Sequence, residues 1–180
     1  MIASLKRKER AWATQRRYHK TLAFIAQTMP APASILDMGT PNAFSKIMQE
    51  KGYTVKNTQG EDFDENPEVL ADASVDAVTS FEVCEHLINP MGALRAIKAK
   101  RLFISVPLRL WFSKAYRNKN DRWDQHYHEF EDWQFDWLLE KAGWEIVRSE
   151  KWKNPILTPG IRPLLRAFTN RYYIIEARRK

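Results

Sequence analysis

The chain has 180 residues and a net charge of +7, with 44% hydrophobic and 28% charged residues, which is typical of a globular protein. That length predicts a single domain over residues 1–180. The one cysteine, Cys84, excludes an intrachain disulfide and a cysteine-based metal cluster. With no apolar run of transmembrane length and no secretory-signal pattern, we expect a cytoplasmic protein.

The positive charge is concentrated at the two ends of the chain. Residues 1–20 hold seven Lys and Arg against one acid, and residues 148–180 hold nine against two, so the middle of the chain carries −6. Basic ends of this kind could favour an anionic partner such as RNA, but solvated faces on terminal elements are the preferred explanation, because no nucleic-acid motif accompanies the charge. RNA remains a possible partner.

The first thirty residues predict a basic helix. Between Leu5 and Met29, apolar residues recur at helical spacing, and the opposite face is rich in Lys and Arg. Pro30-Ala31-Pro32 then ends the helix. We expect this N-terminal helix, residues 1–30, to pack outside a core formed by residues 33–179.

A strand, a tight turn and a helix are predicted next. Ile35-Leu36 reads as a buried strand, and residues 44–48 place apolar side chains on one face of a helix. Asp37 and Gly39 stand in the turn between them. A strand, a tight turn and a helix near the start of an alternating chain is how nucleotide-type cofactor folds begin.

Strands and helices alternate along the rest of the chain, which predicts an α/β fold with a mainly parallel sheet covered on both faces. Gly52 and Gly143 are expected to end helices, and Asn89-Pro90 to begin one. The expected strands are residues 53–58, 75–81, 101–106, 144–147 and 171–175, and the expected helical segments are residues 67–71, 90–97, 131–142 and 162–168.

Residues 74–90 carry the most specific motif. They read SVDAVTSFEVCEHLINP, a buried strand followed by Glu-Val-x-Glu-His-Leu-x-x-Pro. This stretch resembles the fourth-strand region of the class I S-adenosylmethionine (SAM) methyltransferases. Residues 128–144 resemble their penultimate helix and strand, and residues 171–179 resemble their last, antiparallel strand. The resemblance implies a Rossmann-like three-layer sandwich with an antiparallel last strand.

The turn after the first strand resembles motif I of that family, an acidic residue followed by Gly-x-Gly-x-Gly. Asp37 and Gly39 match the motif, whereas Pro41 and Ala43 replace its second and third glycines. The acid that commonly binds the ribose is replaced by Gln59. The stretch from Gln59 to the next strand is short, which indicates that one strand–helix unit is trimmed.

The resemblance implies a set of residues around SAM at the carboxyl ends of the strands. Asp37 alternatively serves as a strand-end acid that caps the turn, and His86, with Glu85, equally fits a structural role in fixing the loop after the strand. The implied cofactor-binding residues are Asp37, Gly39, Thr40, Pro41, Asn42, Gln59, Glu61, Asp62, Phe81, Glu82, Val83 and His86.

Residues 108–128 are aperiodic and rich in aromatic and basic side chains, which predicts a functional connection beside the transferred methyl group. We expect it to form a substrate lid. His126 and His128 are candidate general bases because the pKa of histidine lies near neutrality, although both equally fit packing against the next helix. With Glu129 they form only a weak metal-ligand pattern, so no metal is predicted. The expected lid residues are Trp111, Phe112, Tyr116 and Trp123.

The sequence thus predicts a SAM-dependent methyltransferase whose acceptor is unidentified, with a small molecule as the leading expectation. The alternative is a methyltransferase-like fold that has lost efficient SAM binding and serves as a nucleic-acid or protein binding module. Pro41, Ala43 and Gln59 favour the alternative, and the Glu-His-Leu segment favours the enzyme.

Overall fold

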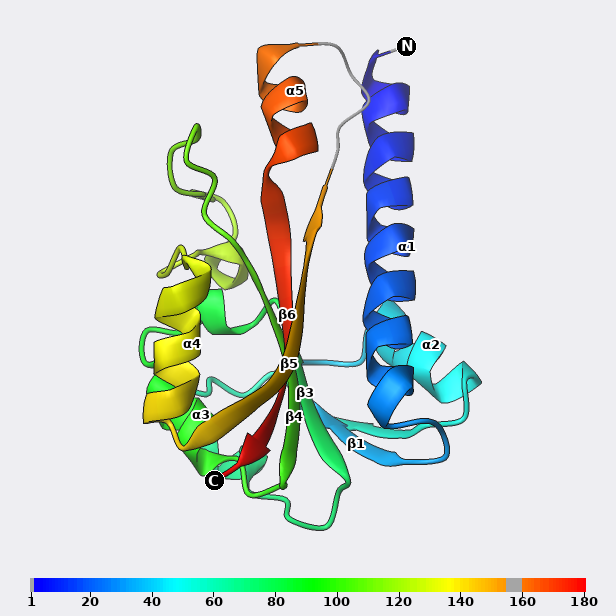
Figure 1. Ribbon diagram of the computed structural model, residues 1–180, viewed down its shortest axis with the longest axis vertical. Coiled ribbons are helices and arrows are strands. Elements are labelled where there is room, and N and C mark those ends of the chain that lie inside the picture. The colour runs from blue at the N-terminus through cyan, green and yellow to red at the C-terminus, as the bar shows by residue number, and fades with distance from the viewer. Residues whose placement is uncertain (1, 155–159) are drawn as a thin grey trace.

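A computed structural model of the chain describes residues 2–154 and 160–180, with side chains for all of these except 2–6 and 122. A six-stranded sheet with the strand order β2-β1-β3-β4-β6-β5 runs through the molecule (Figure 1). The first four of these strands are parallel to one another, and β6 is antiparallel to both of its neighbours. The strands are β1 (Ser34–Asp37), β2 (Thr54–Asn57), β3 (Ala77–Phe81), β4 (Arg101–Pro107), β5 (Trp144–Lys153) and β6 (Asn170–Arg179).

Helices cover both faces of the sheet, which gives three layers (Figure 1). The predicted α/β class, with a mostly parallel sheet and an antiparallel last strand, is confirmed. No helix within residues 2–154 and 160–180 is long and apolar enough to cross a membrane. The helices are α1 (Ile2–Thr28), α2 (Ala43–Glu50), α3 (Pro90–Ala96), α4 (Asp132–Lys141) and α5 (Ile161–Phe168).

The strands divide their side chains between two apolar cores because successive residues of a strand point to opposite faces. In β4, Leu102 and Ile104 join the core beneath α3 and α4, whereas Phe103 joins the core beneath α1 and α2. From α1, Phe24 and Ile25 enter this second core. The N-terminal basic helix therefore packs outside the sheet, as the sequence predicts.

The basic N-terminal helix adjoins part of the basic C-terminal region. Arg16 in α1 donates to the backbone carbonyl of Lys153 at 2.8 Å, and the Lys20 ammonium lies 5.6 Å from the Trp152 ring centroid. The N-terminal part of α1 and the α5 helix occupy the same end of the molecule (Figure 1). Positive charge from α1 and α5 thus contributes to one end of the molecule, whereas the C-terminus lies at the other end (Figure 1).

The connection from β2 to β3 contains only a short 3₁₀ turn, Pro67–Leu70. Leu70 is fully buried beneath α3 and anchors the connection to the core. This confirms the trimmed strand–helix unit that the short spacing predicts.

Strand β5 extends well beyond the predicted residues 144–147, whereas β6 is longer than the 171–175 expected from the local pattern but matches the residues 171–179 implied by the family resemblance. After Val147, β5 continues as Arg-Ser-Glu-Lys-Trp-Lys, a charged pattern with no apolar alternation. The pairing with β6 stabilises this edge strand, with Arg148 opposite Glu176 and Lys151 opposite Tyr173. Tertiary pairing here overrides the local sequence preference.

Candidate functional site

The turn between β1 and α2 opens onto space at the carboxyl ends of the strands. Gly39 has φ of +114°, a conformation that side chains rarely adopt, and a Cβ added there would meet no heavy atom within 4 Å. The Gly39 N–H donates to the Thr58 hydroxyl at 2.8 Å, which ties the turn to the end of β2. The turn is therefore fixed on its inner side and open on the other.

Asp37 is buried directly below this turn, with 3% of its surface exposed. Its two carboxylate oxygens accept from the Thr79 hydroxyl at 2.6 Å and from the Asn57 amide at 2.9 Å. Burial raises the pKa of Asp37 to about 6, and the hydrogen bonds from Thr79 and Asn57 oppose that rise. Asp37 thus joins the ends of β1, β2 and β3.

The residues after Gly39 build the start of α2. Asn42 is its N-cap: the side chain accepts from the backbone N–H groups of Phe44 and Ser45, and Ser45 completes a capping box. The Asn42 amide also donates to the Thr40 carbonyl at 3.2 Å. The side chain of Asn42 is therefore engaged in the turn, while Thr40 and Pro41 are exposed.

The loop after β2 brings an acid back to the strand end. The Gln59 N–H donates to a carboxylate oxygen of Glu61 at 2.6 Å, and the Gln59 side chain donates to the Asn57 carbonyl at 3.4 Å. A Cβ at Gly60 would lie 3.2 Å from the Thr40 methyl, so this loop adjoins the turn after β1. Glu61 thus places a carboxylate beside the end of β2, where this sequence has Gln59 in place of an acid.

Asp62 and Asp64 connect this loop to the segment after β3. Asp62 accepts from the Asp64 N–H at 3.0 Å. The Asp64 carboxylate accepts from the N–H groups of Ile88 and Asn89 at 2.8 and 2.7 Å. Sequence reasoning missed Asp64, because its partners lie about 25 residues away.

At the end of β3 the backbone turns sharply at Glu82, which has φ of +58°. A non-glycine residue in this region is uncommon and often marks a functional turn. The Ser105 hydroxyl donates to the Glu82 carboxylate at 2.9 Å, and Arg17 lies 3.5 Å from its other oxygen. Burial raises the pKa of Glu82, while Arg17 opposes that rise. Val83 packs against the core beneath α3 and α4.

The α1 helix adds two residues that sequence reasoning did not place at the site. Arg17 pairs with Glu82, and Tyr18 stacks on Phe44 with ring centroids 5.1 Å apart. Phe44 in turn meets the edge of Phe81 at 5.5 Å. Tyr18, Phe44 and Phe81 thus form a continuous series of ring contacts from α1 through α2 to the end of β3.

Residues 125–128 are bound along the segment that follows β3. The N–H groups of Tyr127 and His128 donate to the Glu85 carbonyl at 2.8 and 3.2 Å. The His86 Nδ1 lies 3.1 Å from the Gln125 carbonyl. These contacts hold the aperiodic connection over the carboxyl end of β3.

The two candidate bases have different surroundings. His128 Nε2 lies 3.2 Å from the Ile88 carbonyl, and its ring stacks on Phe130 at 5.4 Å. The His126 ring meets that of His86 edge to face at 4.8 Å. Burial lowers the pKa of His126, with His86 adding to the effect. The sequence pairs His126 with His128, but the structure brings His126 to His86 instead.

The residues expected to form a lid differ in exposure and in their contacts. Trp111 and Trp123 are 70% and 74% exposed, and Trp111 contacts Phe112 edge to face at 5.4 Å. Tyr116 lies closer to the site, with its ring 4.5 Å from that of His126.

A cavity of about 330 Å³ is lined by Tyr116, His126 and the cations Arg117 and Lys119. A larger cavity of about 480 Å³, lined by Met29, Asp76 and Arg178 among others, includes none of the site residues.

The strand order β2-β1-β3-β4-β6-β5, with β6 antiparallel to both neighbours, is that of a methyltransferase-like α/β fold. Residues 10–149 match the model of a family described as methyltransferase domain, and the chain belongs to that family. It is a SAM-dependent methyltransferase whose acceptor is unknown.

Solved structures with the same fold are distant in sequence. The chain is similar to 1,6-didemethyltoxoflavin-N1-methyltransferase of Burkholderia thailandensis, solved with bound S-adenosylhomocysteine: the TM-score is 0.68 at 16% identity, covering 99% of this chain and 85% of that one. A SAM-dependent methyltransferase from Archaeoglobus fulgidus gives a TM-score of 0.64 at 16% identity, covering 92% and 94%.

Magnesium protoporphyrin IX methyltransferase from Synechocystis, also solved with S-adenosylhomocysteine, gives a TM-score of 0.57 at 13% identity, covering 96% of this chain and 86% of that one. A comparison with curated protein sequences finds no match. These structures share the fold and leave the acceptor open.

Proposed function

We propose that SAM lies over the Gly39 turn and that the chain transfers its methyl group to a small polar molecule. The observation that carries the proposal is the open space beside Gly39, at the edge of the sheet where parallel strands end. The missing side chain lets a ligand approach the backbone closely. The turn therefore fits the amino-acid end of the cofactor.

The residues around the turn are assigned different roles in binding SAM. Asp37 acts as a positioning residue, because both of its carboxylate oxygens are engaged by Thr79 and Asn57. Glu61, held beside Gln59, is the acid that we assign to the ribose hydroxyls. Phe81 and Val83 form the floor between the turn and the segment after β3.

The acceptor is assigned to the cavity beside His126. Its cations Arg117 and Lys119 favour an anionic or polar acceptor, and its volume of about 330 Å³ suits a small molecule. In the transfer, a lone pair of the acceptor forms the new bond to carbon, and the electrons of the S–CH₃ bond remain on sulfur. The chain contributes alignment and exclusion of water, which supply much of the rate of such a reaction.

The test is the affinity for S-adenosylhomocysteine of variants at the turn, measured by calorimetry. Gly39→Val places a branched side chain in the open space and is expected to abolish binding. Gly39→Ala is expected to weaken binding by at least about tenfold, since its Cβ occupies the same space and strains φ. Ala43→Gly is expected to bind as the parent does, or more tightly.

Gly143→Ala is the matched control. Gly143 has φ of +93°, and an added Cβ would approach Arg179 at 3.5 Å, so the variant carries similar backbone strain. It lies after α4, at the opposite end of the sheet, and should keep full affinity. If folded Gly39→Val binds like the parent, the cofactor does not lie at this turn.

A further inference from the structure

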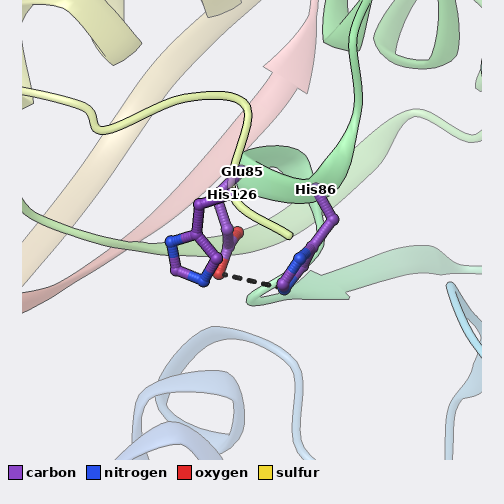
Figure 2. A group of neighbouring side chains, drawn as sticks. All are labelled: Glu85, His86 and His126. Carbon is purple, nitrogen blue, oxygen red and sulfur yellow. Dashed lines mark ion pairs between the residues drawn. The ribbon is translucent and has the colours of Figure 1, made fainter. Parts of the chain in front are cut away.

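Three potential metal ligands converge beside the proposed acceptor cavity. One ligand atom from each of Glu85, His86 and His126 lies within 4.8 Å of the other two. Figure 2 shows the three side chains gathered at one point, with His86 Nε2 3.8 Å from Glu85 Oε1. Glu85 and His86 come from the turn after β3, and His126 comes from the connection after β4. Residues forty positions apart thus meet in one cluster.

The carboxylate of this cluster is buried without a full set of partners. Glu85 is 1% exposed, and among the described residues its Oε2 atom makes no hydrogen bond. Such an atom is costly to bury, because it loses its hydration and gains nothing in return. His126 Nδ1 is likewise buried without a hydrogen bond in the part of the chain that the structure describes.

His86 is already oriented as a metal ligand. Its Nδ1 lies 3.1 Å from the Gln125 carbonyl, which can only accept, so Nδ1 carries the proton. Nε2 then presents its lone pair toward Glu85 and His126. A backbone carbonyl that fixes the tautomer in this way is the usual second partner of a metal-bound histidine.

Two further carboxylates adjoin the cluster. One is that of Glu82, three residues before Glu85; it interacts electrostatically with Glu85, and Arg171 acts on both acids as an opposing cation. Arg17 is paired with Glu82 rather than with Glu85. Glu129 lies 3.9 Å from His126 Nδ1. A bound cation would offset the repulsion between these acids.

We propose that Glu85, His86 and His126 bind one divalent transition-metal ion. Two imidazoles and one carboxylate favour Zn²⁺, Co²⁺ or Mn²⁺ over Ca²⁺ and Mg²⁺, which prefer oxygen ligands. Tetrahedral ligands about 2.1 Å from the ion lie about 3.4 Å from one another, so the side chains close by about 1 Å on binding. The contraction needs only small rotations of the side chains.

Three protein ligands leave at least one coordination position open. Because His126 lines the acceptor cavity, that position faces the acceptor. This step rests on the proposed function: we assign a hydroxyl group of the acceptor to the open coordination position. Coordination to the ion favours transfer of the hydroxyl proton to water. A lone pair of the resulting oxygen then forms the bond to the methyl carbon of SAM, and the electrons of the S–CH₃ bond remain on sulfur. The acceptor class is therefore a hydroxylated small molecule.

The experiment is a titration of the chelator-treated full chain with Zn²⁺ by calorimetry, and with Co²⁺ by visible absorption. We expect one ion per chain at micromolar or tighter affinity, with a Co²⁺ spectrum of low coordination number. His86→Gln, His126→Gln and Glu85→Gln each remove a ligand and should weaken binding at least about 100-fold. Mg²⁺ should compete poorly.

The two remaining histidines are the matched controls. His19 in α1 and His128, which packs on Phe130, lie outside the cluster, so His19→Gln and His128→Gln should keep the parent's affinity. Equal Zn²⁺ affinity in all five variants, or no binding by the parent at about 100 µM Zn²⁺, would overturn the proposal.

S-adenosylhomocysteine is titrated into the same parent protein with and without Zn²⁺. Cofactor binding without metal binding refutes only the metal site. Metal binding without cofactor binding refutes the proposed function and leaves the metal site standing.

Discussion

The contribution of Asp37 to the free energy of unfolding is expected to fall as the pH rises, because burial raises the pKa of its carboxyl group. Its pKa is raised by burial from 3.8 to about 6, so the folded chain binds this proton more tightly than the unfolded chain. The stabilising difference is fully present below about pH 3.8 and is lost as pH rises through about 6. A paired surface carboxylate would behave in the opposite way.

The magnitude follows from the two pKa values. A change from 3.8 to about 6 corresponds to about 3 kcal/mol of the free energy of unfolding. In Asp37→Asn the charge is absent at every pH; the amide oxygen accepts from Asn57, and the amide NH2 donates to the Thr79 hydroxyl oxygen, which reverses that hydrogen bond. The variant should therefore gain on the parent by about 2 kcal/mol between pH 4.5 and pH 8, because the remaining part of the parent's loss falls below pH 4.5.

The assay is urea unfolding of both proteins across that pH range, taking the difference in free energy of unfolding at each pH. Asp76→Asn is the control: Asp76 accepts from the backbone and hydroxyl of Ser34 at an exposed position, and those bonds lower its pKa. Its difference from the parent should hardly change above pH 5. A difference between parent and Asp37→Asn that is constant with pH would refute the reasoning about the Asp37 charge.

Two further predictions concern α1 and the basic ends. Arg17→Met leaves the Glu82 carboxylate without its paired cation and should lower the free energy of unfolding by about 1–3 kcal/mol. Arg16→Met loses only a hydrogen bond to the Lys153 carbonyl and should lower it by less than about 1 kcal/mol. Equal losses for the two variants in urea unfolding would contradict the pairing of Arg17 with Glu82. Because α1 adjoins the outer part of β5, any binding of single-stranded RNA there should weaken steeply with salt in a filter-binding titration, and salt-insensitive retention would exclude RNA as a partner.

The fold was largely predictable because its elements are locally consistent. The helix at α2 has an apolar face and ends before Gly52, and α3 begins at the predicted Asn89 cap, whose side chain accepts from the Gly92 N–H. The length of β5 was not predictable, because β5 is an edge strand of the sheet and its ladder is formed with β6, a partner outside its local sequence. Local sequence carries little information about such pairing.

The sequence predicted which residues belong to the candidate site better than it predicted the contacts between them. The acid and glycine of the first turn were identified from the motif, but the sequence does not show that Asn42 caps α2 or that Asp64 binds the segment after β3. These contacts depend on which loops meet at the sheet edge.

The meeting of Glu85 and His86 with His126 was not predicted, because an aperiodic segment carries His126 across forty residues. The available signal was an acid–histidine pair directly after a buried strand, with a further histidine in the connection that follows the next strand. Parallel strands end at the same edge of a sheet, so loops from neighbouring strands meet there. The spacing alone could not distinguish His126 from His128.

The central claim is that this chain binds SAM at the carboxyl ends of β1, β2 and β3. The most direct measurement is a calorimetric titration of the unmodified chain with S-adenosylhomocysteine. We expect saturable binding at one site per chain, with a parallel rise in the melting temperature. An absence of both heat and thermal shift at about millimolar S-adenosylhomocysteine would contradict the account and favour a binding module that has lost its cofactor.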